Sequence, residues 1–520
     1  MRQGPTSLEQ LMNWPQRLCQ DIWDGSSGEL RRARTACNLA AGLVLAGEYS
    51  GELCAETAIR MQVMGMASNG LTIPLDRIIS YSACEINLMC RRLILQSRHP
   101  PLHLFPSVLN FVKPSDGEEL FKRGPPKYEA KGDTPAEDAR RLEEAMAAFQ
   151  EQSDYLSSHS KTIFTGKRQA KCLIHGKECP IFWQTPSDAS VVPKEDWPIT
   201  WNWSGAICKP WSAMGGQKKL ADPATQVWNV WVANAACSPN DMVTLENSNL
   251  MPARIFKDTL DEFAPGKWLM VGLLVNCQRQ GWPYNRHRSY RTAVNSETMV
   301  WLGPPVSEPD AIQRHFDSIF DCTTELDGDI FLGSTEADVQ EEKEMRYKLA
   351  ASKGIYTRDG SVPAARHCLS RCERRHFDQY GALFGDTKPG EAFIADLSQN
   401  LDARRRYGPR LRAYCTSSVN YSYSQDKFFS QRAARRAHGW PAPGSQAHDL
   451  YGECLPHDWD KTSISFSQSQ LVIGQGMHLG EVGAVFLYIL AHTLRRDLVM
   501  TMIPVPRPVA AAHAEGFEED

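Results

Sequence analysis

The residues of this chain best suited to chemistry lie in one stretch, Ile199 to Pro223, which reads ITWNWSGAICKPWSAMGGQKKLADP. An apolar run with two tryptophans ends at Ser204 and Gly205, and Cys208 follows closely. We expect the run to form a strand and Cys208 to lie on the loop after it, where α/β enzymes place reactive groups. A cysteine there can serve as a covalent nucleophile. Most free cysteines are buried and inert, so this stretch alone favours no chemistry.

Two more polar elements follow Cys208 along the chain. A short apolar segment ends in Glu246-Asn247, and a longer one leads to Arg286 and Arg288. A thiol can act as a covalent nucleophile, and a carboxyl group and guanidinium groups can stabilise charge that develops on a bound substrate. Taken singly, the arginines are equally consistent with an exposed basic hairpin.

A candidate cofactor site precedes these elements. An expected strand runs into a turn that carries Gly47, Ser50 and Gly51, and a helix follows. Glycine lets the backbone approach a ligand, which the helix N-terminus then faces. The next expected strand ends in Glu85-Ile86, and an acid there can accept hydrogen bonds from ribose hydroxyls. An ordinary βα turn and an exposed strand-end charge are the alternatives.

The stretch around Cys208 resembles the nucleophile motif of the DNA cytosine-5 methyltransferases, in which a Cys lies between Pro and a sequence such as Gln-Pro-Phe-Ser. Glu246 resembles the acid of that family's Glu-Asn-Val motif. Arg286 and Arg288 match the arginines of its Gly-x-Pro-Gln-x-Arg-x-Arg motif. Residues 473–490 resemble its last motif, Gly-Asn-Ser-Val before a helix. The cofactor-binding residues that the resemblance implies are Gly47, Ser50, Gly51, Glu85, Ile86, Pro210, Gln475 and Gly476.

The resemblance implies an α/β fold, a Rossmann-like S-adenosylmethionine-dependent methyltransferase sheet with one late antiparallel strand and a smaller target-recognition domain. It implies methylation of carbon 5 of cytosine in DNA. Cys208 would be the nucleophile, Glu246 would bind ring nitrogen 3 and the exocyclic amine, and Arg288 would bind the ring carbonyl oxygen. Arg286 would support Glu246 or bind a phosphate. We expect positive neighbours to lower the pKa of Cys208.

Two alternatives remain open. The tRNA-directed branch of the same family shares the nucleophile and the acid, so RNA is a second possible partner. A catalytically inactive relative that only binds nucleic acid is the other, because Ile207, Tyr284 and Gln475 stand where the family has Pro, Gln and Asn.

The chain divides by composition into five expected parts. They are an N-terminal extension (1–30), a catalytic domain (31–302) with an insertion (114–170), a recognition domain (303–435), a return to the catalytic domain (436–500) and a disordered tail (501–520). Within the insertion, Thr134 predicts a helix start through a capping box with Glu137.

Composition bounds the class of protein. The 520 residues are 42% hydrophobic and 23% charged, which is typical of globular domains. The 15 cysteines are odd in number and no apolar leader opens the chain, so we expect a reducing, intracellular location, nuclear or otherwise DNA-associated. The longest apolar run, 482–491, is too short to span a bilayer and predicts a buried helix without membrane association.

Charge is unevenly distributed although the net charge is only −4. Residues 307–345 contain 12 acidic and 2 basic side chains, and residues 346–440 contain 18 basic and 8 acidic ones. The asymmetry indicates a surface that faces a polyanion, or else an Arg-rich solvated surface. The run Arg404-Arg405-Arg406-Tyr407 combines cations with an aromatic ring and could follow phosphates.

Two short clusters hold residue types that bind zinc. They are Cys172, His175 and Cys179, and then His367, Cys368, Cys372 and His376. The first lacks a fourth ligand nearby, so loop packing is favoured. In the second, Cys368, Cys372 and His376 would share one helix face, but interleaved arginines disfavour a dication and indicate a basic helix face. We therefore expect no metal.

Overall fold

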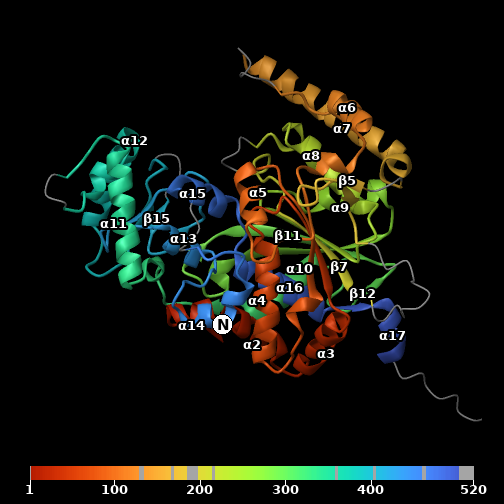
Figure 1. Cartoon of the computed structure of the whole chain (residues 1–520), viewed down its shortest axis with the longest axis horizontal. Coiled ribbons are helices and arrows are strands. Elements are labelled where there is room, and N and C mark those ends of the chain that lie inside the picture. The colour runs from red at the N-terminus through yellow and green to blue at the C-terminus, as the bar shows by residue number, and fades with distance from the viewer. Residues whose placement is uncertain are drawn as a thin grey trace, which may run out of the picture.

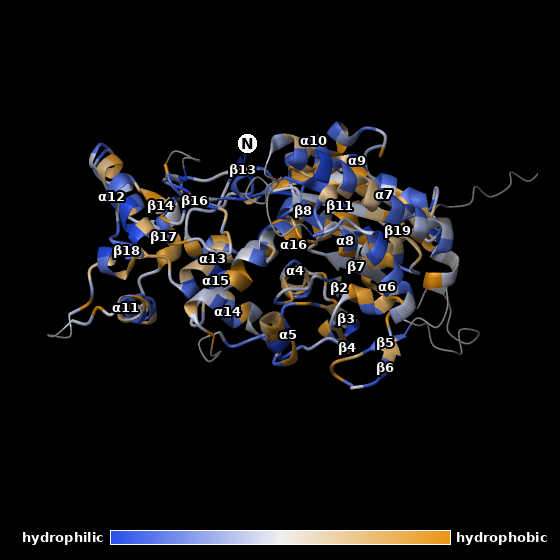
Figure 2. Ribbon diagram, turned by 90° about the horizontal axis from the view of Figure 1, so that it is seen from above, coloured by the Kyte–Doolittle hydropathy of each residue, from blue (hydrophilic) through white to orange (hydrophobic). Residues whose placement is uncertain are grey.

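The computed structural model describes residues 2–127, 134–165, 169–183, 197–212, 217–357, 361–401, 406–459 and 464–502. Figure 1 shows a large α/β unit and a smaller unit that carries α11 (Glu336–Ala351) and α12 (Arg371–Gly385). In Figure 2 the helices α13 (Gln431–Ala437), α14 (Gln446–Tyr451) and α15 (Phe466–Gln475) lie between the two units.

A seven-stranded sheet forms the centre of the large unit, with the strand order β4-β3-β2-β7-β8-β11-β9. All neighbours are parallel except β11, which runs antiparallel to both β8 and β9. The strands are β2 (Leu43–Glu48), β3 (Ile78–Cys84), β4 (His103–Phe105), β7 (Ile199–Ser204), β8 (Met242–Ser248), β9 (Trp268–Asn276) and β11 (His287–Asn295). The predicted fold class, a mostly parallel α/β sheet with one late antiparallel strand, is confirmed.

Helices cover both faces of this sheet, so inner strands such as β2 and β8 are buried along nearly their whole length. Along β8, Met242 belongs to one hydrophobic core and Val243 to the other. Helices α2 (Trp14–Trp23), α3 (Gly28–Leu39), α4 (Cys54–Ser68), α10 (Pro309–Phe320) and α16 (Leu479–Ala491) contribute to the first core. Helices α7 (Pro135–Thr165), α8 (Thr225–Ala236) and α9 (Ala253–Phe263) contribute to the second.

The chain reverses direction across the sheet between β2 and β7. It moves outward from β2 through β3 to β4, and then returns to place β7 on the other side of β2. Ligands of open α/β sheets bind outside the carboxyl ends of the strands at such a switch point. The ends of these two strands, Glu48 and Ser204, are paired neighbours, so the predicted cofactor turn and the Cys208 loop begin side by side.

The first residues pack onto the large unit. Trp14 is fully buried and donates a hydrogen bond from Nε1 to the Gly439 carbonyl at 3.1 Å. Besides α1 (Leu8–Met12), this part contains β1 (Arg2–Gln3), which pairs with β13 (Cys322–Thr323). The segment therefore ties parts of the chain that are far apart in sequence.

The insertion (114–170) contains a helical pair, and a small hairpin begins at its last residues and extends beyond it. Helix α6 (Pro114–Arg123) packs on α7, which begins just after Thr134. The Glu137 amide donates to Thr134 Oγ1 at 3.2 Å, so the predicted helix start is confirmed. Strands β5 (Gln169–Lys171) and β6 (Glu178–Pro180) follow as an isolated antiparallel pair.

The smaller unit has its own sheet, in the order β15-β14-β17-β18, and its own core, which includes Tyr380, Phe393 and Tyr421. The strands are β14 (Ile394–Asp396), β15 (Tyr407–Gly408), β17 (Asn420–Ser422) and β18 (Lys427–Phe428). Strand β16 (Leu411–Arg412) instead pairs with β10 (Tyr284–Asn285) of the large unit. Helix α10, from the same 303–435 interval, packs on β9.

Much of the charge asymmetry is internal. Asp338 of the acidic block pairs with Arg436 at 2.5 Å and with Arg432 at 3.2 Å, and Glu342 pairs with Arg346 at 2.6 Å. Arg406 pairs with Asp396, so it supports the small sheet. The interpretation of these arginines as a polyanion-facing surface is wrong, because burial requires each of them to have a partner. Arg404 and Arg405 lie outside the described residues.

The C-terminal part of the chain returns to the large unit through a small sheet. Strand β12 (Met299–Trp301) pairs antiparallel with β19 (Thr493–Arg495). Helix α17 (Arg496–Met502) follows, so the chain is helical up to residue 502. The rest of the predicted tail lies outside the described residues.

One apolar stretch is long enough to cross a membrane by length and composition. It runs from Phe466 to Ala491 through α15 and α16, and 89% of its most apolar window is buried inside the protein. Every residue of α16 is buried, which confirms the predicted core helix.

Candidate active site

The Cys208 loop begins where β7 ends. The amides of Trp211 and Ser212 donate to the Cys208 carbonyl at 3.0 and 2.8 Å, which closes a tight turn after the cysteine. Asn247 of β8 donates from Nδ2 to the Ala206 carbonyl at 3.2 Å. The neighbouring strand therefore fixes the loop, and the predicted Glu-Asn pair lies directly beside it.

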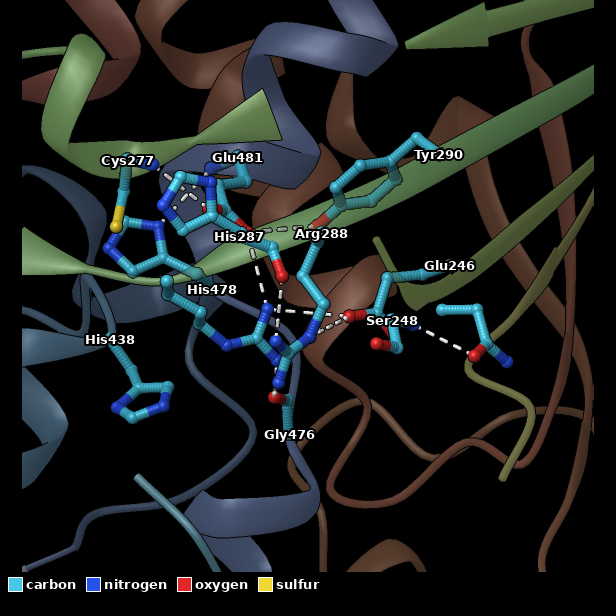
Figure 3. Close-up of polar contacts among 12 residues, drawn as sticks. Glu246, Ser248, Cys277, His287, Arg288, Tyr290, His438, Gly476, His478 and Glu481 are labelled. Carbon is cyan, nitrogen blue, oxygen red and sulfur yellow. Dashed lines mark hydrogen bonds and ion pairs between the residues drawn. The ribbon is translucent and has the colours of Figure 1, made fainter. Parts of the chain in front are cut away.

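The predicted carboxyl group and arginines meet in space although they are far apart in sequence (Figure 3). Glu246 Oε1 lies 2.9 Å from Arg288 Nε and 3.3 Å from Arg286 Nη1. The other oxygen faces the Cys208 loop, since a Cβ added to Gly205 would lie 4.0 Å from Glu246 Oε2. Antiparallel pairing of β8 with β11 explains the geometry, because it sets the two strand ends against one another.

Arg286 is only 2% exposed and has several partners. Besides Glu246, it pairs through Nη1 with Glu481 Oε2 at 3.2 Å and donates from Nη2 to the Gly476 carbonyl at 2.8 Å. The sequence left two roles open for this arginine. Its burial and its partners favour support of Glu246 over contact with a phosphate.

Glu481 is a site residue that the sequence analysis missed. It is fully buried in the first turn of α16, accepts the Cys277 amide at 3.0 Å and accepts the Tyr290 hydroxyl at 3.3 Å. Burial raises its pKa to about 7, and the Arg286 charge opposes that rise. A lone carboxyl group in an otherwise apolar helix was the available signal, since such a charge needs a buried partner.

The thiol of Cys208 is not activated as we expected. Burial raises the pKa of Cys208, the Glu246 carboxylate adds to the rise, and Arg288 and Arg286 oppose it. The expected lowering is wrong because desolvation outweighs the arginines, whose charge Glu246 partly neutralises. These three neighbours nevertheless lie within electrostatic range of the thiol.

A small pocket lies at the switch point of the sheet. Its lining includes five predicted cofactor residues, namely Gly47, Ser50, Gly51, Gln475 and Gly476. The other lining residues are Glu48, Tyr49, Cys54, Ala55, Glu56, Trp203, Gly205 and Met477. The structure thus brings the first predicted glycine turn and the C-terminal Gln475-Gly476 element together.

Three predicted cofactor residues, Glu85, Ile86 and Pro210, do not line this pocket, and only Glu85 contacts its glycine turn. Glu85 accepts the Gly51 amide on Oε2 at 2.9 Å and the Asn87 amide on Oε1 at 2.7 Å, so it lies against the glycine turn. Ile86 is 63% exposed. Pro210 does not line the pocket, and its carbonyl accepts the Lys219 amide at 2.9 Å.

The donor set of the pocket fits a polar, cationic ligand. Two carboxyl groups, those of Glu48 and Glu56, are buried in the pocket lining. Their burial raises the pKa of each to about 7. The hydroxyl of Tyr49 and Nε1 of Trp203 are buried without a hydrogen-bond partner among the described residues. The cavity holds only about 10 Å³, room for roughly one water, so a larger ligand requires side chains to move.

The two buried carboxyl groups predict a specific pH dependence of stability. Their pKa of about 7 in the folded chain lies above the ordinary 4.5. The folded state therefore binds more protons between these values, and the free energy of unfolding should fall as pH rises from about 5 to 7. One such group accounts for up to about 3 kcal/mol.

Glu56→Gln should flatten this fall, as measured by urea unfolding at several pH values between 5 and 8. Glu118→Gln, at an exposed position, is the matched control and should follow the wild-type curve. Parallel curves for wild type and Glu56→Gln would contradict the assignment.

Comparisons with known proteins add a remote likeness of fold. No family model and no curated protein matches the chain. A putative DNA modification methyltransferase encoded within an E. coli prophage is similar with a TM-score of 0.41 and 11% identity, over 87% of this chain and 98% of that one. A DNMT2 mutant from Spodoptera frugiperda is similar with a TM-score of 0.37 and 11% identity, over 86% of this chain and 99% of that one. The Dnmt2 methyltransferase of S. pombe is similar with a TM-score of 0.36 and 10% identity, over 86% of this chain and 98% of that one. Likeness at this level carries no argument about function.

Proposed function

We propose that this chain is an S-adenosylmethionine-dependent methyltransferase that methylates carbon 5 of cytosine in DNA through a covalent adduct on Cys208. One observation carries the proposal. A thiol loop, a carboxyl group and two arginines converge beside a pocket at the switch point of a mostly parallel sheet.

The reaction explains why a thiol is needed. Carbon 5 of cytosine is a poor nucleophile while the ring is aromatic. When Cys208 Sγ forms a bond to carbon 6, the displaced electron pair makes carbon 5 nucleophilic. When bound, S-adenosylmethionine would supply the methyl group from its sulfonium to carbon 5, and its sulfur would leave as a neutral thioether. Loss of the proton from carbon 5 then allows the bond between carbon 6 and Cys208 to break, which returns the thiolate.

The acid and the arginines hold the base. Glu246 Oε2, which faces the Cys208 loop, would accept from the exocyclic amine, and a proton shared between the carboxyl group and ring nitrogen 3 would complete the contact. Arg288 would donate to the ring carbonyl oxygen, where negative charge develops. Arg286 is a positioning residue, because both of its carboxylate partners and the Gly476 carbonyl fix it in place. A base bound to Glu246 would also screen that carboxylate from the thiol.

The pocket residues match what the cofactor requires. Glu85, at the end of β3, would accept hydrogen bonds from ribose hydroxyls, and its Gly51 contact places it at the turn. Glu48 and Glu56 would place negative charge near the sulfonium. Gly205 lets the Met477 side chain pack close to the backbone in the pocket lining, since a Cβ at this position would lie 2.9 Å from Met477 Cε.

Contacts with nucleic acid would involve the smaller unit. Arg371, Arg374 and Arg375 line one hollow on α12 together with Arg366. Arg366 is already paired with Asp378 at 2.9 Å. Exposed arginines on one helix face are suited to phosphates, whereas the base must leave the duplex at a cost of a few kcal/mol to reach Cys208.

Trapping on 5-fluorocytosine tests the proposal. Fluorine at carbon 5 cannot leave as a proton does, so the adduct should persist when the chain is incubated with S-adenosylmethionine and a duplex oligonucleotide bearing this base. We expect an SDS-resistant complex with DNA, and a tRNA bearing the same base is the parallel substrate. Trapping on tRNA alone would assign the chain to RNA, and trapping on neither would reject the covalent mechanism.

The small volume of the pocket favours a second candidate function, nucleic-acid binding without catalysis. A catalytically inactive relative that only binds nucleic acid would have no need to accommodate a cofactor, and a cavity of about 10 Å³ is consistent with that. Titration calorimetry with S-adenosylmethionine separates the two. Measurable binding supports the enzyme, whereas DNA binding without cofactor binding supports the inactive relative.

A further inference from the structure

A second cluster of reactive side chains lies away from the proposed active site, at the outer edge of the sheet. Cys172, His175 and Cys179 belong to the hairpin of β5 and β6, and His103 begins the edge strand β4. One potential ligand atom from each of the four lies within 4.8 Å of the others. It is the one such group within the described part of the chain. The fourth ligand, which sequence spacing did not reveal, comes from about 70 residues upstream.

We propose that His103, Cys172, His175 and Cys179 form a structural zinc site that fastens the β5–β6 hairpin to the edge of the central sheet. Two thiolates and two imidazoles are a set that tetrahedral structural zinc sites use. The proposal does not depend on the proposed methyltransferase function.

The distances support tetrahedral geometry. His175 Nδ1 lies 3.5 Å from Cys172 Sγ and 3.4 Å from Cys179 Sγ. Zinc bonds of about 2.3 Å to sulfur and about 2.0–2.1 Å to nitrogen, at tetrahedral angles, place such S and N atoms about 3.5 Å apart. The ring centroids of His103 and His175 are 5.2 Å apart, so both imidazoles reach the same point. The two sulfur–nitrogen separations therefore match those around zinc, and all four ligand atoms lie within 4.8 Å of one another.

The turn between the two cysteines is built to present its ligands. The Gly176 amide donates to the Cys172 carbonyl at 2.9 Å, and the Cys172 amide donates to the Lys177 carbonyl at 2.9 Å. Gly176 has φ +66°, a conformation that favours glycine and here returns the chain toward β6. This compact turn brings His175 between the two sulfur atoms.

One ligand atom of the cluster lacks any other partner. Nδ1 of His103 is buried and has no hydrogen-bond partner within the described ranges. A buried polar atom without a partner costs free energy, and a bound metal ion would supply that partner.

The hairpin lies outside the central sheet. Two-stranded hairpins are marginal in water, and within the described residues β5 and β6 pair only with each other. Residues of both strands pack in the second hydrophobic core. The Leu173 amide donates to the Leu104 carbonyl at 2.7 Å, and the Tyr81 hydroxyl donates to the Pro180 and Phe182 carbonyls at 3.0 and 2.8 Å. Zinc would complete this attachment and cover the exposed edge of β4.

The other cysteine and histidine cluster supplies a control. Cys368 lies on a short 3-10 helix before α12, so it does not share a helix face with Cys372 and His376 as we expected. Cys368 Sγ lies 3.4 Å from the Arg346 carbonyl, and His376 Nδ1 lies 2.8 Å from the Leu397 carbonyl. Cys372 is exposed, so its replacement should leave the fold intact.

The test measures zinc in the full-length chain, expressed with added zinc and purified under reducing conditions without chelators. We expect about one zinc per chain by mass spectrometry, and an X-ray absorption edge that fits two sulfur and two nitrogen ligands. His103→Gln and Cys179→Ser should each lower the bound zinc at least about tenfold after dialysis against a weak chelator, while Cys372→Ser should retain it.

Reconstitution of the wild-type chain keeps the proposal testable even where a variant misfolds. The reduced chain, treated with cobalt chloride, should show intense tetrahedral Co²⁺ absorption that one equivalent of zinc chloride abolishes. A wild-type chain that takes up neither metal, a disulfide between Cys172 and Cys179, or full zinc content in both His103→Gln and Cys179→Ser would overturn the proposal.

Discussion

Cys208→Ala should lower the rate of methyl transfer to cytosine-containing DNA by at least about a thousandfold, with little change in stability. Without the thiol, no group can add at carbon 6, and carbon 5 remains part of an aromatic ring. Cys208 is half-buried on a loop rather than in either core, so its loss leaves little cavity. The measurement is transfer of a labelled methyl group from S-adenosylmethionine under single-turnover conditions.

One matched variant and the pH dependence of the wild-type rate make this result specific. Cys37→Ala, on α3 and far from the loop in sequence, should transfer methyl groups at the wild-type rate. Because the pKa of Cys208 is raised by burial, the wild-type rate should also increase as pH rises above neutrality, as the thiolate becomes more populated. A Cys208→Ala chain that retains a tenth or more of wild-type activity would remove the covalent step from the mechanism.

The residues that we propose as the catalytic set could be expected near one another from the sequence because each stands close to one end of a strand. Cys208 follows β7, Glu246 lies near the carboxyl end of β8, and Arg286 and Arg288 flank the start of β11. In an α/β sheet the carboxyl ends of parallel strands meet at one edge, and an antiparallel neighbour begins there. Knowledge of strand order was not required to expect these groups near one another.

What could not be predicted depends on contacts between distant segments. Nothing local to Cys172 indicates that His103 completes its cluster, because that contact exists only once the hairpin packs on β4. In the sequence, Asp338 belongs to an acidic segment and Arg436 to a basic one. Only the structure shows that the two side chains form an ion pair. The direction of the pKa shift of Cys208 also required the depth of its burial, which residue types do not reveal.

The cofactor side was predicted less completely for a related reason. The glycine turn and Gln475-Gly476 come from opposite ends of the chain and meet because α16 packs on α4. The resemblance placed them together, but it did not reveal that Glu48 and Glu56 share the pocket. Glu48 and Glu56 lie within apolar stretches of the sequence. The sequence does not show which buried groups surround such an acid, so their shared pocket could not be predicted.

Arg286→Met should lower the free energy of unfolding by about 3–5 kcal/mol at pH 8, the largest single effect on stability that we expect in the site. The change leaves two carboxylates near one another with one cation fewer. Glu246 keeps Arg288 at 2.9 Å, but Glu481 retains only the Cys277 amide and the Tyr290 hydroxyl. An uncompensated charge in a fully buried position costs far more than the lost contact itself.

The destabilisation should depend on pH in a direction that identifies Glu481 as its cause. The pKa of Glu481 is already about 7, and removal of the opposing Arg286 charge should raise it further. The carboxyl group would then take up a proton on folding, so the loss should be smaller at pH 5 than at pH 8. Urea unfolding of wild type and Arg286→Met at both values measures this difference.

The double variant Arg286→Met with Glu481→Gln completes the argument. Replacement of the orphaned acid by a neutral amide should recover part of the stability at pH 8 and make it nearly independent of pH. Arg288→Met is the comparison at the other arginine, where 17% side-chain exposure lets water replace the guanidinium, so its cost should be smaller. An equal loss for Arg286→Met at both pH values, with no recovery in the double variant, would show that Arg286 acts through packing rather than through the charge of Glu481.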